Sequence, residues 1–143
     1  MFLGEYKHLL DQKGRLAIPA KFRSKLVDGL VLTRGIDQCL FIYSKEEWEK
    51  FLKKIMNLPL TQANSRAFLR LIFSGAIEED LDQQGRILIP ENLRNYANLK
   101  KQVVIVGVFN RIEIWDEKIW EEYKQNTENE AYKIAEDLKD LGI

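Results

Sequence analysis

The sequence predicts an α+β domain made of two pseudo-symmetric halves. A thirteen-residue stretch occurs twice, as DQKGRLAIPAKFR at residues 11–23 and as DQQGRILIPENLR at residues 82–94. Seven of the thirteen positions are identical, whereas unrelated segments would share about one. The same succession of strand-like and helix-like patterns follows each copy, so the duplication is one of structure as well as sequence.

The duplication extends beyond this stretch. Glycines and aromatic residues recur at an offset of 71 or 72, which defines repeats at residues 4–52 and 75–124. A helical insertion at residues 53–74 separates the repeats, and residues 125–143 form a C-terminal helix. Two copies are too few for an open solenoid, because the end repeats would expose apolar faces. We therefore expect one domain, residues 1–143, with its halves closed about a pseudo-two-fold axis.

The first repeat begins with a strand at residues 5–10. DQKG is then a type I turn, in which Asp11 accepts backbone N–H groups and Gly14 adopts a positive φ. RLAIP then forms a second strand, and Pro19 occupies the first position of a helix over residues 20–27. The remaining elements are strands at residues 30–35 and 39–43 and a helix that Ser44 caps.

The helix after Ser44 carries an apolar stripe typical of core packing. Its members are Trp48, Phe51, Leu52, Ile55 and Met56. The insertion adds a helix that Thr61 caps and that runs to Gly75. The second repeat has strands at residues 76–81, 86–90, 102–109 and 111–115 and helices at residues 91–97 and from Asp116. The polar residues after Lys124 interrupt that last helix, and an amphipathic helix follows whose apolar face packs on its own domain or on a neighbouring subunit.

Bulk composition indicates a soluble intracellular protein. No run of 18 apolar residues is present, the N-terminal segment carries charge too early for a signal peptide, and the single Cys39 cannot form an internal disulfide. The formal net charge is zero, which argues against a general polyanion binder. The charge is uneven, however, since residues 1–44 hold seven basic and four acidic residues while residues 116–143 hold four and nine.

The residues required for catalysis are scarce, and we expect no enzyme activity, cofactor, metal or small-molecule substrate. The chain has one His and one Cys and lacks the nucleotide-binding and zinc-protease motifs. His8 in a strand is interpreted as structural and Cys39 as a core residue. The acidic run of Glu78, Glu79, Asp80 and Asp82 is interpreted as a solvated edge, because no ligand loop surrounds it.

The Asp-x-x-Gly-Arg unit of the repeated stretch has two interpretations. In one it is a structural turn whose Asp accepts backbone hydrogen bonds. In the other, Arg15 and Arg86 project from matching positions and contact phosphate or the O6/N7 edge of guanine. On this second interpretation the DNA-binding residues are Arg15, Arg86, Lys13, Arg23 and Arg94, and Asp11, Gly14, Asp82 and Gly85 hold the loops. Arg34 is expected to lie nearby.

These motifs closely resemble the bacterial MraZ family over nearly the whole chain. The resemblance is carried by MFLGEY at the start, the paired DQKGRLAIPAKFR and DQQGRILIP motifs, LTRGIDQCLFIY and NRIEIWD. It implies a fold similar to the AbrB/SpoVT swapped-hairpin β-barrel with flanking helices, in which the two halves of one chain replace two subunits.

The resemblance also implies a function. MraZ proteins are DNA-binding transcriptional regulators of the division and cell wall gene cluster, including their own promoter, and they bind short direct repeats in double-stranded DNA as ring-shaped homo-oligomers. The family's D-x-x-x-R motif corresponds to Asp11 and Arg15 and to Asp82 and Arg86. A cytoplasmic, nucleoid-associated regulator without membrane attachment is thus expected.

Two features leave alternatives open. Gln84 replaces Lys13 in the second copy, whose approach is acidic, so the two motifs need not contribute equally. A ring-forming scaffold that binds protein partners without DNA is the alternative function, and a small-molecule-binding barrel is a third. Neither explains why both turns keep an arginine.

Overall fold

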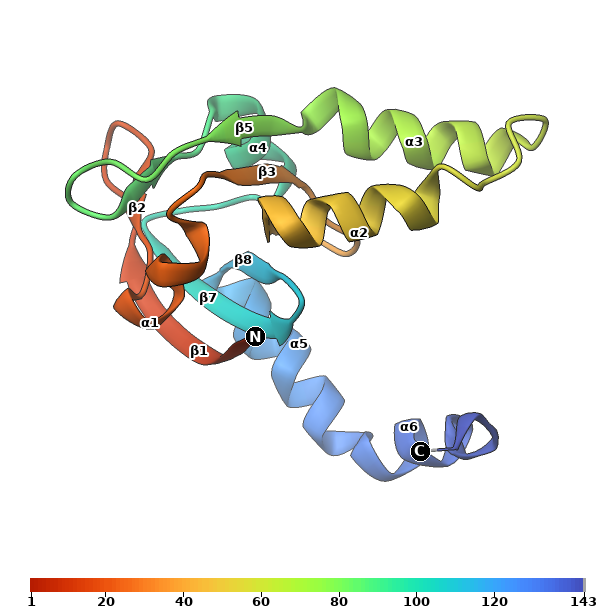
Figure 1. The fold of residues 1–143 in the computed structure, drawn as a ribbon. Coiled ribbons are helices and arrows are strands. Elements are labelled where there is room, and N and C mark those ends of the chain that lie inside the picture. The colour runs from red at the N-terminus through yellow and green to blue at the C-terminus, as the bar shows by residue number, and fades with distance from the viewer. Residues whose placement is uncertain (143) are drawn as a thin grey trace.

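The computed structural model describes residues 1–142, which form a mixed α+β domain (Figure 1). The strands are β1 (Phe2–Leu9), β2 (Arg15–Ala17), β3 (Leu30–Arg34), β4 (Leu40–Ser44), β5 (Ile77–Glu79), β6 (Arg86–Leu88), β7 (Gln102–Phe109) and β8 (Ile112–Asp116). The α-helices are α1 (Ala20–Arg23), α2 (Lys45–Ile55), α3 (Ala63–Gly75), α4 (Glu91–Tyr96), α5 (Glu117–Asn129) and α6 (Ala131–Asp137). Two 3-10 helices lie at Ser24–Leu26 and Lys139–Leu141.

Six strands form an antiparallel sheet in the order β1-β7-β8-β4-β3-β5. The outer strands are exchanged between the halves of the chain, since β1 pairs with β7 and β5 pairs with β3. The sheet's centre is the pair β4 and β8, where Phe41 faces Glu113. Within residues 1–142 the sheet is open, with β1 and β5 as its edges.

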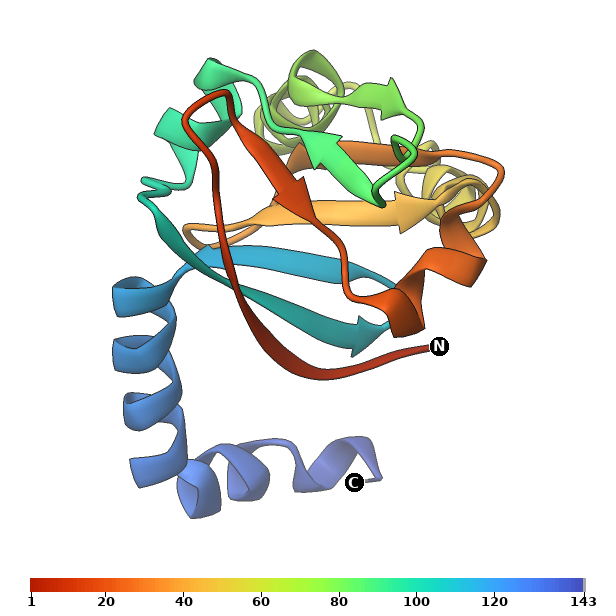
Figure 2. The same ribbon diagram turned by 90° about the vertical axis from the view of Figure 1, so that its left-hand side faces the viewer.

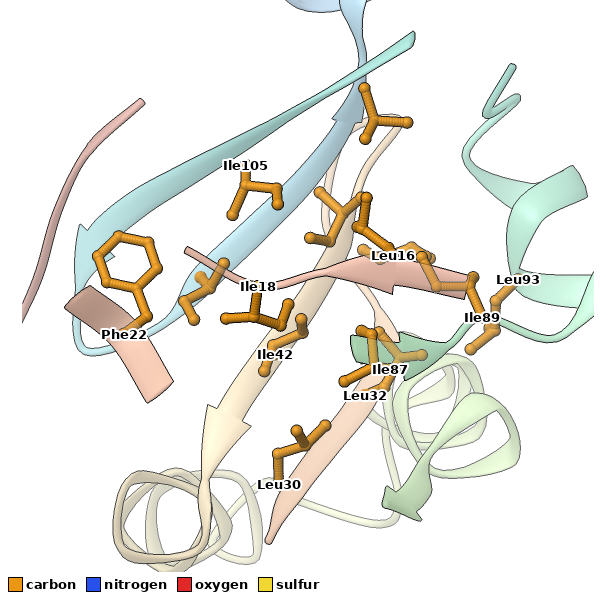
Figure 3. Packing of buried hydrophobic residues seen from close by; sticks show 14 of the residues in the cluster. Leu16, Ile18, Phe22, Leu30, Leu32, Ile42, Ile87, Ile89, Leu93 and Ile105 are labelled. Carbon is orange, nitrogen blue, oxygen red and sulfur yellow. The ribbon is translucent and has the colours of Figure 1, made fainter. Parts of the chain in front are cut away.

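The other two strands, β2 and β6, form a separate antiparallel ribbon that crosses one face of the sheet (Figure 2). Leu16 and Ile87 point inward from the ribbon and are 0% and 1% exposed, as the alternation of apolar residues in RLAIP and RILIP requires. Figure 3 shows them among the side chains of the sheet and helices. The cluster includes Ile18, Phe22, Leu30, Leu32, Ile42, Ile89, Leu93 and Ile105. The main core therefore lies between ribbon and sheet.

A second, aromatic cluster lies on the opposite face of the sheet, beneath α2 and α5. Tyr43 stacks on Phe51 with ring centroids 5.0 Å apart, and Trp115 packs on Trp120 at 5.3 Å. The start of α2 is fixed where Ser44 Oγ accepts a hydrogen bond from the backbone N–H of Glu47. Because the centre of β7 is covered on both faces, its buried residues Val103, Val104, Ile105 and Val106 form a continuous apolar run.

Two helical arms extend away from the ribbon (Figure 1). One is the α2–α3 hairpin, and the other is α5 followed by α6. Their exposed large hydrophobic side chains are Met56, Leu60, Phe73, Tyr123, Tyr132, Ile134, Leu138 and Leu141. Over residues 1–142, every helix is too short or too polar to traverse a lipid bilayer.

Several element boundaries differ from those expected. The first strand begins at Phe2 instead of residue 5, and the helix expected at residues 20–27 is one turn of α1 followed by a 3-10 turn. The expected Thr61 cap is wrong, because α3 starts after Gln62 and that end has no side-chain cap. Met56 is 68% exposed, so it does not belong to the buried stripe of α2.

The predicted interruption after Lys124 is also wrong. α5 continues to Asn129, and Thr127 Oγ1 donates to the carbonyl oxygen of Tyr123, so its hydroxyl is satisfied without breaking the helix. The break falls at Glu130, where the chain bends sharply and α6 runs across the direction of α5 (Figure 2). The last residue of the expected helix 125–143 lies outside the described residues.

Candidate nucleic-acid interface

The β2–β6 ribbon brings the two copies of the repeated stretch together. Arg15 pairs with Leu88, Leu16 with Ile87, and Ala17 with Arg86. Leu16 and Ile87 are equivalent positions, so the pseudo-two-fold axis passes through the middle of the ribbon. Because Leu16 and Ile87 point inward, Arg15 and Arg86 lie on the outward face as diagonal neighbours, about 7–8 Å apart.

Turn one, residues 11–14, is held closed by its aspartate. Asp11 Oδ1 accepts hydrogen bonds of 2.8 Å from the backbone N–H groups of Lys13 and of Arg15. The N–H of Gly14 donates to the carbonyl oxygen of Asp11 at 3.1 Å, with Gly14 at a φ of +85°. Glycine adopts this conformation without the strain that a side chain adds.

Turn two, residues 82–85, has the same geometry. Asp82 Oδ1 accepts from the N–H groups of Gln84 at 2.9 Å and Arg86 at 2.8 Å, and Gly85 has a φ of +73°. One contact differs from turn one: Arg86 Nε donates to Asp82 Oδ2 at 2.9 Å. The second arginine is therefore partly neutralised by its own turn.

Each turn is covered by an arginine from the other repeat. A Cβ at Gly14 would collide with the guanidinium of Arg94, and a Cβ at Gly85 would collide with that of Arg23. Arg23 is anchored further, because its Nε donates to the carbonyl oxygen of Ile18 at 2.7 Å. The sequence placed Arg23 and Arg94 among the DNA-binding residues, and the structure places both half-buried against the turns.

The first turn carries the more available positive charge. Lys13 is exposed and Arg15 half-buried, and within residues 1–142 neither forms a salt bridge. Gln84 occupies the position equivalent to Lys13 in turn two. The ribbon is thus two-fold symmetric in its arginines but not in its charge.

Hydrogen bonds hold the pKa of both turn aspartates below the ordinary value. The largest cause for Asp11 is the N–H of Arg15, and for Asp82 it is the N–H of Arg86. The positive charges of Arg15 and Arg86 lower the pKa of Asp11 as well. Both aspartates are therefore ionised at neutral pH.

Lys100 and Lys101 lie beside turn one, and sequence reasoning missed them. The backbone N–H of Leu10 donates to the carbonyl oxygen of Lys101 at 2.8 Å. An open hollow of about 420 Å³ is lined by both lysines and by Leu10, Asp11 and Gln12. The only sequence feature that indicates these residues is the lysine doublet itself. Its position beside the first turn depends on the pairing of β1 with β7, which the sequence does not show.

Two other expectations need correction. Arg34 was expected to lie near the turns, but it lies against α3 instead. Its Nη1 donates to the carbonyl oxygen of Leu71 and to Ser74 Oγ, and these hydrogen bonds anchor α3 to the sheet. The acidic run is not wholly solvated, since Glu79 Oε1 accepts from the N–H of Leu88 at 3.0 Å and its Oε2 is buried without a partner within the described residues. Burial raises the pKa of Glu79.

His8 and Cys39 lie where the sequence suggested. His8 is half-buried, and burial lowers its pKa. Cys39 is fully buried, and its Sγ donates to the carbonyl oxygen of Ile36 at 3.1 Å. In residues 1–142, the acidic and thiol side chains nowhere gather into a group suited to a metal ion.

Comparison with known proteins identifies the family. The model of the family described as "MraZ protein, putative antitoxin-like" matches residues 1–71 and again residues 72–141. The chain belongs to the MraZ family. The double match divides the chain within α3, at the insertion between the two turn-bearing repeats.

Relatives in the MraZ family are similar over their full length. A protein named "Transcriptional regulator MraZ" from Halothermothrix orenii is 55% identical over 143 residues, which is 100% of both chains. Proteins of the same name from Thermoanaerobacter pseudethanolicus and another Thermoanaerobacter strain are each 51% identical over the same span.

Proposed function

We propose that this MraZ-family protein is a sequence-specific regulator of transcription that binds double-stranded DNA through the outward face of the β2–β6 ribbon. The observation that carries the proposal is the diagonal placement of Arg15 and Arg86 on that face, each fixed by a closed turn. The printed names of the full-length relatives support regulation of transcription.

The proposed contacts follow from the chemistry of the turns. Arg15 and Arg86 present planar guanidinium groups suited to phosphate oxygens or to the guanine edge in the major groove. Lys13 adds a phosphate contact from its exposed position, and Arg23 and Arg94 add charge from half-buried positions. Asp11, Gly14, Asp82 and Gly85 preset the turns, so little conformational entropy is lost on binding.

The MraZ resemblance supplies the finer proposal. The targets are short direct repeats upstream of the division and cell wall gene cluster, including the protein's own promoter, and the site of action is the nucleoid in the cytoplasm. The protein has no catalytic role and acts without cofactor. The repeats 4–52 and 75–124 form the functional unit, a variant of the AbrB/SpoVT swapped-hairpin barrel, and the exchange of β1 and β5 supports this proposal.

Assembly into a homo-oligomeric ring belongs to the same proposal. Ring formation places several ribbons on one DNA, and avidity then supplies affinity that a chain of zero net charge lacks. The exposed apolar side chains of the two helical arms support subunit contacts, because α6 has no buried residue in the isolated chain. Cooperative binding that depends on the number of repeats is expected.

The test is fluorescence anisotropy with the duplex that lies just upstream of the protein's own reading frame, against a shuffled duplex of equal composition. We expect preference for the native duplex and a steep decrease in affinity as salt rises. Equal, weak binding to both duplexes would contradict the proposal and would favour the scaffold alternative, in which the ring binds protein partners.

A further inference from the structure

The two ends of the ribbon differ in charge far more than the repeated motif does. Five basic residues lie in or beside turn one, namely Lys13, Arg15, Arg94, Lys100 and Lys101. Three carboxylates oppose them, that of Asp11 in turn one and those of Asp116 and Glu117, which line a neighbouring hollow together with both lysines. At the other end, an acidic group lies on and beside turn two, made of Asp28, Glu78, Glu79, Asp80 and Asp82.

The difference arises at equivalent positions of the two repeats. The pairing of the strands places Lys101 at the position equivalent to Asp28. Ser44 and Asp116 are equivalent helix caps that pair with Leu30 and Val103, so the offset between the repeats is 73 here. Gly29 lies next to the acidic run, because a Cβ added to it would be 3.1 Å from Asp80 Oδ1. The fold therefore delivers two lysines to the first turn and an aspartate to the second.

The lysine doublet is held in place by its backbone while its side chains remain exposed. The N–H of Lys100 donates to Asp116 Oδ1 at 3.1 Å, and the carbonyl oxygen of Lys101 accepts from Leu10. Both lysines are exposed, and within residues 1–142 neither forms a salt bridge. Both residues border the same hollow as Asp11 and Gln12 of turn one.

At turn two the basic groups are largely engaged. Arg86 pairs with Asp82, and Lys45 pairs with Glu78 at 3.2 Å. Arg23 donates to the carbonyl oxygen of Ile18. A phosphate chain that approached this end would meet carboxylates, whereas at turn one it would meet exposed lysines, so the phosphate backbone is attracted more strongly to the turn-one end of the ribbon.

We propose that Lys100 and Lys101 form an additional phosphate-binding site beside turn one, and that this site fixes a single orientation of the chain on duplex DNA. The inference rests on the proposed function. The phosphate backbone runs along the hollow beside turn one, and the acidic end points away from it. The two arginines alone would allow the ribbon to bind DNA equally well in two opposite orientations. The lysine site restricts it to one of them.

The first experiment removes the lysine doublet. Lys100→Ala/Lys101→Ala is compared with Lys53→Ala/Lys54→Ala, a matched doublet that is exposed on α2, in anisotropy titrations with the upstream duplex at several salt concentrations. Removing two phosphate-binding lysines reduces the slope of log K against log salt by about 1.8, at about 0.9 for each neutralised phosphate. The control is expected to keep the wild-type slope, and Lys100→Arg/Lys101→Arg to restore it.

The second experiment determines the orientation of the chain on the DNA. A DNA-cleaving iron chelate is attached at Gln12→Cys or at Gln83→Cys, which are equivalent exposed positions in the two turns, while Cys39 is buried and unreactive. We expect strong cleavage at one side of each binding site from position 12 and weak cleavage from position 83. Equal cleavage from both positions, or an unchanged salt slope in the lysine variant, would overturn the inference.

The outcomes separate the two proposals. If the wild-type protein does not prefer the upstream duplex, the proposed function fails and the inference fails with it. If the wild type binds with preference but the lysine doublet contributes nothing to the slope, only the inference fails.

Discussion

Arg94 lies against Gly14, and its counterpart Arg23 lies against Gly85, so each repeat supplies the arginine that covers the other repeat's turn. The backbone reinforces this crossing, since the N–H of Ile18 donates to the carbonyl oxygen of Gly85 and the N–H of Ile89 to that of Gly14. The turns are thus held by contacts across the pseudo-two-fold axis as well as by their own aspartates.

The glycine in the first turn is expected to be intolerant of substitution. Gly14→Ala places a Cβ 2.8 Å from the carbonyl oxygen of Ile89 at a φ of +85°, and we expect the free energy of unfolding to decrease by about 1–3 kcal/mol. Gly142→Ala is the matched control, because Gly142 has the same φ but nothing within 4 Å of an added Cβ. Urea denaturation measures both, and equal losses would show that the crowding at turn one is unimportant.

The arginine over the second turn is expected to contribute to stability. Arg23→Ala removes the hydrogen bond to Ile18, so we expect a loss of about 1.5–3 kcal/mol in the free energy of unfolding, the usual range for a charged donor. Arg94→Ala is expected to cost less than Arg23→Ala, since no corresponding side-chain hydrogen bond of Arg94 is present in residues 1–142. Denaturant titration of the two variants tests the order, and the reverse order would contradict it.

Glu79 is expected to make stability depend on pH. Burial raises its pKa in the folded state above the ordinary 4.5, so ionisation opposes folding, and this penalty grows as pH rises through 4.5 and the folded-state pKa. Glu79→Gln keeps an oxygen acceptor for Leu88, and its advantage over the wild type should be absent below pH 4 and present at pH 7. Glu78→Gln on the exposed neighbour is the control. A Glu79→Gln advantage that is the same at pH 4 and pH 7 would exclude ionisation as its cause.

The local elements of the fold were predictable because their signals are local. The repeated Asp-x-x-Gly-Arg unit determines a turn by short-range hydrogen bonds, and the alternation around Leu16 and Ile87 determines which side of each strand is buried. The start of α2 at Ser44 follows equally from a cap four residues long. These features require no knowledge of distant contacts.

The remaining features depend on which segments meet. The exchange of β1 brings Lys101 to Leu10, and the pairing of β2 with β6 brings Arg94 to Gly14. No pattern within either segment encodes these neighbours. Arg34 was expected near the turns, but α3 of the insertion binds its guanidinium through the carbonyl oxygen of Leu71. The sequence therefore showed the acidic approach to the second motif, but not the two lysines that lie beside the first turn.

The central claim is that the two arginines on the ribbon face bind DNA. The measurement that tests it most directly is anisotropy of Arg15→Ala/Arg86→Ala with the upstream duplex, beside Arg66→Ala/Arg70→Ala, which removes the same charge from the exposed face of α3. Removal of each arginine that binds a base through two hydrogen bonds is expected to cost about 1–3 kcal/mol of binding free energy, with thermal stability and oligomer size unchanged. If both double variants bind like the wild type, or if both lose affinity equally, the ribbon face is not the DNA-binding surface.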